Sequence, residues 1–207
     1  MTLQQQFGHI DIYLFDQLLR GRIRPGQRVL DVGCGGGRNL VYLLREGFEV
    51  YGTDIDPAAV AGVQALAADL APGTPADRFR VEPLEQPSFA VASMDVVLCN
   101  TVLHFARGHA HFDQMVDSLW RLVAPGGLLF ARLASSIGMA DRMQPLGEGR
   151  YHLPDGSDRY LVDEARLAAT TRRLGGTLLD PLKTTVVQDQ RCMTTWVIGK
   201  PHSPSVG

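Results

Sequence analysis

The sequence has few cysteines, no long apolar run and no excess of charge of either sign. Its 207 residues include only three cysteines, Cys34, Cys99 and Cys192, which are widely spaced and form no C-x-x-C pair. Such a set predicts neither a disulfide framework nor a zinc ribbon and favours a reducing compartment. The 20 lysines and arginines against 22 aspartates and glutamates give a net charge of −2. This balance disfavours a dedicated nucleic-acid-binding protein.

Two further absences concern membranes and export. No apolar stretch approaches the roughly 18–20 residues that are needed to span a bilayer. The first 15 residues lack a basic segment followed by an apolar core and a small-residue cleavage site. We therefore expect a cytoplasmic protein with no membrane partner. The composition, 45% hydrophobic and 20% charged, is that of a globular chain, and the length predicts one domain over residues 1–207.

The hydrophobic periodicity predicts strands that alternate with helices. We expect helices at 9–22, 40–46, 57–70, 110–124 and 163–174, and strands at 28–32, 49–53, 79–82, 95–99, 128–133, 184–188 and 193–198. The Pro-Gly-Gly sequence at 125–127 is expected to end the helix at 110–124 and to separate it from the fifth strand at 128–133. Three residues join the last two strands, so these must be antiparallel. The alternation as a whole predicts an α/β protein whose parallel sheet is covered by helices on both faces.

A glycine loop follows the first predicted strand. Gly33, Gly35 and Gly37 would let the backbone pass close to a ligand, although a tight turn with no ligand has the same pattern. Asp54 ends the second strand about 20 residues later, where a carboxylate can accept hydrogen bonds from a ribose diol. Asp56 precedes Pro57 and is better explained as a helix N-cap. The loop and Asp54 together predict a nucleoside-containing ligand.

The loop sequence discriminates among nucleoside ligands. A dinucleotide fingerprint requires a further glycine, and Arg38 follows Gly37 instead; a G-K-[ST] phosphate loop is also absent. The segment VLDVGCGGGRNL resembles motif I of the class I S-adenosylmethionine-dependent methyltransferases. The resemblance extends over residues 27–133 through VYGTDIDP, MDVVLCNTVLHF and LWRLVAPGGLLFARL. Within that family, CGGGRNLVYLLREGFEVYGTDID is similar to the small-molecule branch that includes tellurite-resistance methyltransferases.

This resemblance implies a fold and an activity. The fold would be a Rossmann-like three-layer α/β/α sandwich, with a mostly parallel sheet and an antiparallel last strand. The activity would be methyl transfer from S-adenosylmethionine to a small-molecule acceptor, leaving S-adenosylhomocysteine. A nicotinamide-dependent oxidoreductase and a non-catalytic nucleoside-binding module stay open as alternatives, because methyl transfer needs no diagnostic side chain.

The resemblance also implies roles for individual residues. Asp54 would hold the ribose, Ile55 would pack against adenine, and Glu82 would stand near the adenine amine, where the family usually has an aspartate. The implied cofactor-binding set comprises Asp31, Gly33, Cys34, Gly35, Gly37, Asp54, Ile55, Glu82 and Asn100. We interpret the Cys34 and Cys99 side chains as buried filler rather than nucleophiles, since no activating base is apparent.

His104 is the candidate catalytic residue. It is either a general base or a pocket histidine that contributes shape and one hydrogen bond. No metal site is expected at His109 and His111, because residues two apart on a helix face different directions. Residues 134–162 form an unusually long connection, which predicts a substrate lid or a surface hairpin around Pro154-Asp155-Gly156-Ser157. Tyr13, Tyr151 and Arg159 are the candidate acceptor-binding residues, and the oligomeric state is not predicted.

Overall fold

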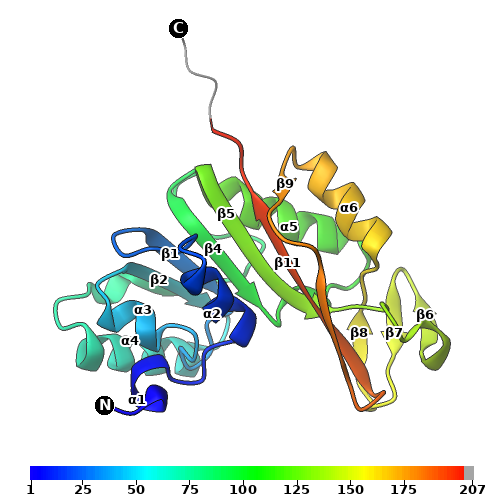
Figure 1. Cartoon of the computed structure of the whole chain (residues 1–207), viewed down its shortest axis with the longest axis horizontal. Coiled ribbons are helices and arrows are strands. Elements are labelled where there is room, and N and C mark those ends of the chain that lie inside the picture. Colours follow the sequence, from blue (N-terminus) through cyan, green and yellow to red (C-terminus); the bar gives the residue numbers. More distant parts are fainter. Residues whose placement is uncertain (203–207) are drawn as a thin grey trace, which may run out of the picture.

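One large sheet organises the molecule. The computed structural model describes residues 1–202, and its strands lie in the order β10-β11-β5-β4-β1-β2-β3, with β9 (Thr177–Leu178) paired to β11 (Figure 1). The strands are β1 (Arg28–Val32), β2 (Glu49–Asp54), β3 (Phe79–Val81), β4 (Met94–Asn100), β5 (Val123–Ala134), β10 (Lys183–Val187) and β11 (Arg191–Gly199). β1 to β5 are parallel, whereas β11 is antiparallel to both β5 and β10. The mostly parallel sheet with an antiparallel last strand is therefore confirmed.

Helices cover both faces of this sheet. Helices α2 (Ile12–Leu19), α3 (Val41–Arg45) and α4 (Pro57–Leu70) bury Leu14, Leu43 and Val63 in one core, together with Val29 of β1. Helices α5 (His109–Leu122) and α6 (Glu164–Arg173) bury Leu119 and Leu167 in a second core, together with Leu30. Val29 and Leu30 are neighbours on one strand, so they point to opposite faces. The predicted three-layer α/β/α sandwich is confirmed.

The N-terminal helix is shorter than predicted. In place of one helix over 9–22, the structure has α1 (Leu3–Phe7) and α2, separated by Gly8 at φ 63°. A Cβ at Gly8 would lie 2.8 Å from Val41 Cγ2, so glycine is also needed there for packing. Asp11 caps α2 through its side chain, which accepts a hydrogen bond from the Tyr13 N–H. The cap fixes where the helix begins.

The Pro-Gly-Gly sequence lies within a strand, which corrects the predicted break. β5 begins at Val123, and its register against β4 shifts between Met94 and Val96. The Gly126 N–H donates to the Lys200 carbonyl, and the Lys200 N–H donates to the Gly127 carbonyl. These bonds pair the bulged segment with the chain after β11, so tertiary pairing overrides the local breaking tendency of the three residues.

The long connection after β5 folds into a small separate sheet. It contains the 3-10 helix η3 (Ala140–Arg142) and three antiparallel strands, β6 (Gln144–Gly147), β7 (Arg150–His152) and β8 (Asp158–Tyr160). The predicted hairpin turn at 154–157 joins β7 to β8. Met139, Met143 and Leu153 of this insertion form a third core together with Cys192 and Met193 of β11. Arg142 pairs with Asp189 at 2.5 Å, which ties the insertion to the tip of the β10–β11 hairpin.

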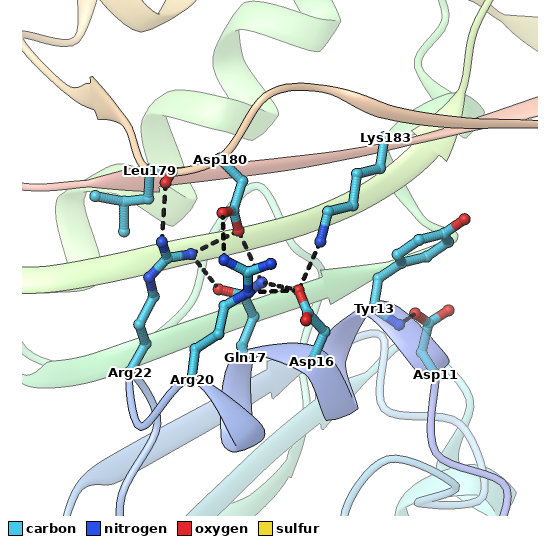
Figure 2. Close-up of polar contacts among 9 residues, drawn as sticks. All are labelled: Asp11, Tyr13, Asp16, Gln17, Arg20, Arg22, Leu179, Asp180 and Lys183. Carbon is cyan, nitrogen blue, oxygen red and sulfur yellow. Dashed lines mark hydrogen bonds and ion pairs between the residues drawn. The ribbon is translucent and has the colours of Figure 1, made fainter.

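A polar network fastens α2 to the segment that leads into β10 (Figure 2). Asp16 pairs with Lys183 at 2.6 Å, and the Gln17 amide donates to Asp180 at 2.9 Å. Arg22 donates to Asp180 at 2.5 Å. Gln17 and Asp180 are both buried, so these bonds satisfy polar groups that would be costly to leave unpaired. The helix is thereby fixed over the edge of the sheet that carries β10 and β11.

Candidate active site

A first cavity of about 390 Å³ lies at the carboxyl ends of the central parallel strands. Ligands of open α/β sheets bind at this end of the strands. The lining includes Val32, Gly33, Asp54, Ile55, Glu82, Leu84, Glu85, Thr101, Val102, Phe105, Arg107, His111 and Met115. Four residues of the predicted cofactor set, Gly33, Asp54, Ile55 and Glu82, therefore border one cavity.

Asp54 and Asp56 make different hydrogen bonds. The Asp54 Oδ2 accepts a hydrogen bond from the Gly35 N–H at 2.9 Å, and its Oδ1 accepts one from the Asp56 N–H at 3.0 Å. The carboxylate thus joins the glycine loop to the end of β2. Asp56 is confirmed as the N-cap of α4, since its side chain accepts a hydrogen bond from the Ala58 N–H at 2.9 Å.

The three predicted loop glycines are required for different reasons. All three have positive φ values, 73° at Gly33, 50° at Gly35 and 75° at Gly37. A Cβ at Gly33 would collide with Val102, and one at Gly37 would lie 2.9 Å from Val63 Cγ2. At Gly35 a Cβ would meet nothing within 4 Å. Packing within the fold accounts for Gly33 and Gly37, whereas Gly35 faces open space.

Two buried polar side chains, each directly before a residue of the cavity lining, have atoms with no hydrogen-bond partner within residues 1–202. Asp31 is 1% exposed, and its Oδ1 has no hydrogen bond; Asn100 is 5% exposed, and neither amide atom has one. Unpaired buried polar atoms are costly. Burial raises the pKa of Asp31 to about 7, and the Asp54 charge acts in the same direction. Both residues end or adjoin strands that form the cavity floor, and a ligand with polar groups would satisfy them.

The first cavity combines apolar walls with negative charge. Ile55 is 73% exposed and Phe105 is 58% exposed, and both border this cavity, so their apolar surfaces are available to a ligand. Three carboxylates, Asp54, Glu82 and Glu85, face one arginine in the lining. Such a lining suits a ligand with an aromatic ring and a positive centre. S-Adenosylmethionine, which carries an adenine ring and a sulfonium, fits it.

A second cavity of about 360 Å³ adjoins the first. Thr101 borders both, directly after β4. Its φ of 65° is rare for a β-branched residue, and the conformation is held by the Thr101 N–H, which donates to the Arg132 carbonyl at 2.7 Å. Backbone strain of this kind concentrates at functional sites. The two cavities therefore meet at a strained residue at the end of a central strand.

His104 borders the second cavity and is 7% exposed. The Ala134 N–H donates to its Nδ1 at 3.3 Å, so the neutral ring carries its proton on Nε2. Burial, with a smaller contribution from Arg159, lowers the pKa of His104 to about 4. At neutral pH the ring is therefore uncharged, with its acceptor nitrogen occupied and its Nε2 able to donate one hydrogen bond. This geometry favours the pocket histidine over the general base.

Several other predicted site residues lie outside the two cavity linings, among them Cys34, Tyr13 and Tyr151. The Cys34 side chain packs in the core beside Gly52, and burial raises the pKa of its thiol to about 12. The Tyr13 hydroxyl bonds to Thr185 at 2.8 Å, and Tyr151 packs against the core of the insertion. Of the three candidate acceptor residues, only Arg159 lines the second cavity. The predicted burial of the Cys34 side chain is confirmed, whereas the acceptor-binding roles of Tyr13 and Tyr151 stay predictions.

His111 is occupied within the protein. Its Nδ1 accepts a hydrogen bond from the Arg107 N–H at 3.0 Å, and its Nε2 lies 2.6 Å from Glu85 Oε1. His109 instead contacts the Tyr160 hydroxyl at 3.0 Å. Within residues 1–202 no group of three or more histidine, cysteine or acidic side chains is arranged to hold a metal ion.

Several lining residues were missed by the sequence analysis. Thr101 and Arg132 lie at the carboxyl ends of β4 and β5. Because ligands bind at this end of parallel strands, both residues could have been predicted from the positions of their strands. The remaining residues of the second cavity come from segments far apart in the sequence; they are Arg38, Ala134, Leu153, Asp155, Ser157, Val187, Arg191 and Met193. No local pattern connects them, and only the tertiary fold does.

The sheet order is that of the Rossmann-like methyltransferase fold. Comparison with known proteins leads to the same fold. Residues 30–131 match the family model described as a methyltransferase domain. Over these residues the chain is similar in sequence to methyltransferases, and its fold is that of solved S-adenosylmethionine-dependent methyltransferases. It is 35% identical over 156 residues to a ubiquinone biosynthesis O-methyltransferase of Paracidovorax citrulli. That match covers 71% of this chain and 62% of the relative, so the chain spans less than two thirds of the relative's length.

Solved structures share the fold at low sequence identity. An S-adenosylmethionine-dependent methyltransferase of Methanosarcina mazei has a TM-score of 0.72 at 18% identity, over 90% of this chain and 98% of that one. The 1,6-didemethyltoxoflavin-N1-methyltransferase of Burkholderia thailandensis, solved with S-adenosylhomocysteine and its substrate, has a TM-score of 0.69 at 19% identity, over 94% and 79% of the two chains. No helix within residues 1–202 has the length and apolar character to cross a membrane.

Proposed function

We propose that this protein transfers a methyl group from S-adenosylmethionine to a small-molecule acceptor. The observation that carries the proposal is the junction of the two cavities at Thr101. The first cavity has the glycine loop, the Asp54 carboxylate and the exposed Ile55 that suit the cofactor. The second opens beside it and suits an acceptor. A reaction between two bound molecules needs such adjacency, because alignment of reactants can lower a barrier by roughly 7–11 kcal/mol.

Different residues in and beside the first cavity are assigned to different parts of S-adenosylmethionine. We assign Asp54 to the ribose hydroxyls, Ile55 to a face of the adenine and the Gly33–Gly37 loop to the backbone approach. The buried and unpaired groups of Asp31 and Asn100 suit the polar methionine portion. We assign Glu82 to the adenine end. Its carboxylate accepts from the Ser88 N–H at 2.9 Å, which holds it in place.

The chain itself supplies position rather than acid–base chemistry. The bound cofactor brings an activated methyl group on a sulfonium. A lone pair of the acceptor forms the new bond to the methyl carbon, the C–S bonding electrons stay on sulfur, and any proton on the acceptor atom leaves to solvent. We propose that the Nε2–H of His104 donates a hydrogen bond that orients the acceptor, because its Nδ1 is occupied by Ala134.

The decisive test is ligand binding followed by transfer. We expect calorimetry to detect S-adenosylmethionine and S-adenosylhomocysteine binding, and no binding of NAD. Ligand at 100 times Kd should stabilise the protein by roughly 2.7 kcal/mol. Incubation with radiolabelled S-adenosylmethionine and a screen of small thiols, amines, carboxylates, phenols and oxyanions should then transfer label. Binding of NAD alone would favour an oxidoreductase, and binding without transfer would favour a nucleoside-binding module.

Two finer predictions accompany this function. We propose a cytoplasmic location and no nucleic-acid partner, supported by the cysteine pattern and the balanced charge. The likeness to tellurite-resistance enzymes stays a prediction that the oxyanion arm of the screen tests. Residues 134–162 are proposed as the acceptor lid, because Leu153, Asp155, Ser157 and Arg159 of this segment line the second cavity.

A further inference from the structure

The second cavity has an unusual concentration of arginine. Four arginines line it, Arg38, Arg132, Arg159 and Arg191, together with one carboxylate, Asp155. Arg38 directly follows the glycine loop, Arg132 lies near the end of β5, Arg159 on β8 and Arg191 at the start of β11. The fold therefore brings together arginines from four separate segments. Guanidinium groups bind carboxylates and phosphates through paired N–H donors.

The carboxylates around this cavity do not balance its arginines. Asp11 lies behind the wall and pairs with Arg132 at 2.7 Å, with Arg38 further away at 4.0 Å. Asp155 lies 3.9 Å from Arg191. The lining itself thus holds four arginines and one carboxylate, and Asp11 behind Arg132 and Asp31 near Arg38 offset part of this charge, so an excess of positive charge is left. His104, which is uncharged at neutral pH, neither adds to nor reduces this excess.

Arg159 is the arginine most available to a ligand. It has no ion pair with any carboxylate of the described residues. One of its nitrogens donates to the Asp158 carbonyl at 2.8 Å, and the guanidinium stacks over the Phe105 ring at 4.9 Å. Phe105 lines the first cavity. Stacking fixes the plane of the guanidinium near the boundary between the two cavities, which leaves its other donors free.

Arg132 is held rigidly from behind. The carboxylate of Asp11 both caps α2 and pairs with Arg132, and the Asp11 side chain is 1% exposed. The Nε of Arg132 is buried and has no hydrogen-bond partner within the described residues. Since the network of Figure 2 fixes α2, it also fixes the Asp11 carboxylate behind this arginine. A preorganised charge of this kind loses little freedom when it binds an anion.

The remainder of the lining indicates that the ligand is organic. Leu153, Val187 and Met193 are apolar members of the wall. The volume of about 360 Å³ is more than ten times the roughly 30 Å³ that one water occupies in the liquid. A bare inorganic anion would leave most of this space and the apolar wall uncovered. The volume is instead in the range of small-molecule sites.

We propose that the methyl acceptor is an organic anion, an apolar body with a carboxylate or phosphate group that Arg132 and Arg159 bind. The proposal rests on the proposed function, since it assigns the second cavity to the acceptor. The anionic group lies at the arginines, and the nucleophilic atom of the same molecule lies toward Thr101, where the two cavities meet. A molecule with no charge would leave the excess positive charge of the lining uncompensated.

Matched acid and neutral probes test the proposal without knowledge of the natural acceptor. With S-adenosylhomocysteine present and ionic strength constant, melting temperatures are measured against benzoate and benzamide, and against phenyl phosphate and phenol. We expect each anion to bind at least fivefold more tightly than its neutral partner. Arg159→Gln should abolish that preference, and Arg159→Lys should restore part of it. Arg150→Gln is the matched control, because Arg150 lies on the neighbouring strand β7 and outside the cavity lining.

The outcomes separate this inference from the proposed function. If S-adenosylhomocysteine binds but neutral probes bind as well as their anions, the organic-anion proposal is overturned and the methyltransferase proposal stands. The same conclusion follows if Arg159→Gln and Arg150→Gln have equal effects on the anions. If S-adenosylhomocysteine does not bind at all, the proposed function itself fails. Arg159→Gln removes no ion pair of the described residues, so it should remain folded and the test stays interpretable.

Discussion

Replacement of Asp54 by alanine should weaken cofactor binding and, separately, destabilise the fold. The Asp54 side chain borders the first cavity, where its carboxylate is assigned to the ribose hydroxyls. A hydrogen bond to a charged group contributes about 1.5–3 kcal/mol. Loss of this contribution corresponds to a Kd for S-adenosylhomocysteine that is about 10- to 150-fold higher.

The stability cost of the same substitution follows from two backbone contacts. Asp54 accepts hydrogen bonds from the Gly35 and Asp56 N–H groups at 2.9 and 3.0 Å. Each such bond contributes about 0.5–1.5 kcal/mol net, so Asp54→Ala should lower the free energy of unfolding by about 1–3 kcal/mol. Urea denaturation without ligand measures this loss of unfolding free energy. Calorimetry well below the melting temperature measures the Kd for S-adenosylhomocysteine.

Asp56→Ala is the matched control. Asp56 is an exposed aspartate two residues away, and it caps α4. Its loss should cost about 1 kcal/mol of stability through the cap and leave the Kd for S-adenosylhomocysteine within about twofold. Asp54→Asn keeps one carbonyl acceptor and should fall between wild type and alanine. The ribose assignment is refuted if Asp54→Ala and Asp56→Ala are equally destabilised and both bind S-adenosylhomocysteine with the wild-type Kd.

Four further predictions address other parts of the site. The pKa of His104 is about 4 in the folded protein, below the 6.5 of a free histidine. As the pH falls, the His104 ring is therefore protonated in the unfolded chain before it is protonated in the folded one. Wild type should therefore lose about 2 kcal/mol relative to His104→Gln as pH falls from 7.5 to 5, and equal pH dependence in denaturation curves would contradict this. Gly35→Ala and Gly47→Ala both place a side chain at positive φ with nothing within 4 Å; each should cost about 1 kcal/mol, and only Gly35→Ala should weaken S-adenosylhomocysteine binding. A glycine-serine turn in place of residues 154–158 should leave that affinity within about tenfold but slow transfer to a confirmed acceptor by about a hundredfold; wild-type turnover would reduce the insertion to a surface hairpin. Asp180→Ala, which unpairs Arg22 and buried Gln17, should lower the unfolding free energy by about 2 kcal/mol, and an unchanged urea midpoint would show that the network of Figure 2 contributes little.

The predicted residues that border the first cavity could be found from the sequence because their signals are local. The glycine loop, Asp54 and Ile55 lie within about 25 residues, and each follows directly from a strand whose hydrophobic pattern is clear. In a parallel sheet the carboxyl ends of neighbouring strands meet at one edge, so the sequence pattern alone brings these residues together. Cys34 belongs to the same loop, and its side chain packs in the core, as the sequence predicted. Membership of a motif does not specify which way a side chain points.

The acceptor side was not predictable to the same degree. Tyr13 and Tyr151 were proposed as acceptor-binding residues, and in the structure the first bonds to Thr185 and the second packs against the core of the insertion. The role of His104 also depended on a nonlocal contact, because the Ala134 N–H occupies its Nδ1. Burial and hydrogen-bond partners decide which nitrogen carries the proton, and neither can be obtained from the identity of the residue.

The sequence by itself determined the α/β class, the parallel sheet and the end of it where the cofactor binds. Periodicity, caps and loop glycines act over a few residues, and they suffice for those features. Only the tertiary structure decided that four arginines from separate segments share one cavity, that Thr101 joins the two cavities, and that Asp11 pairs with Arg132 across 121 positions of the chain. The charge and the shape of a cavity depend on residues that are distant in sequence, and only the folded chain brings those residues together.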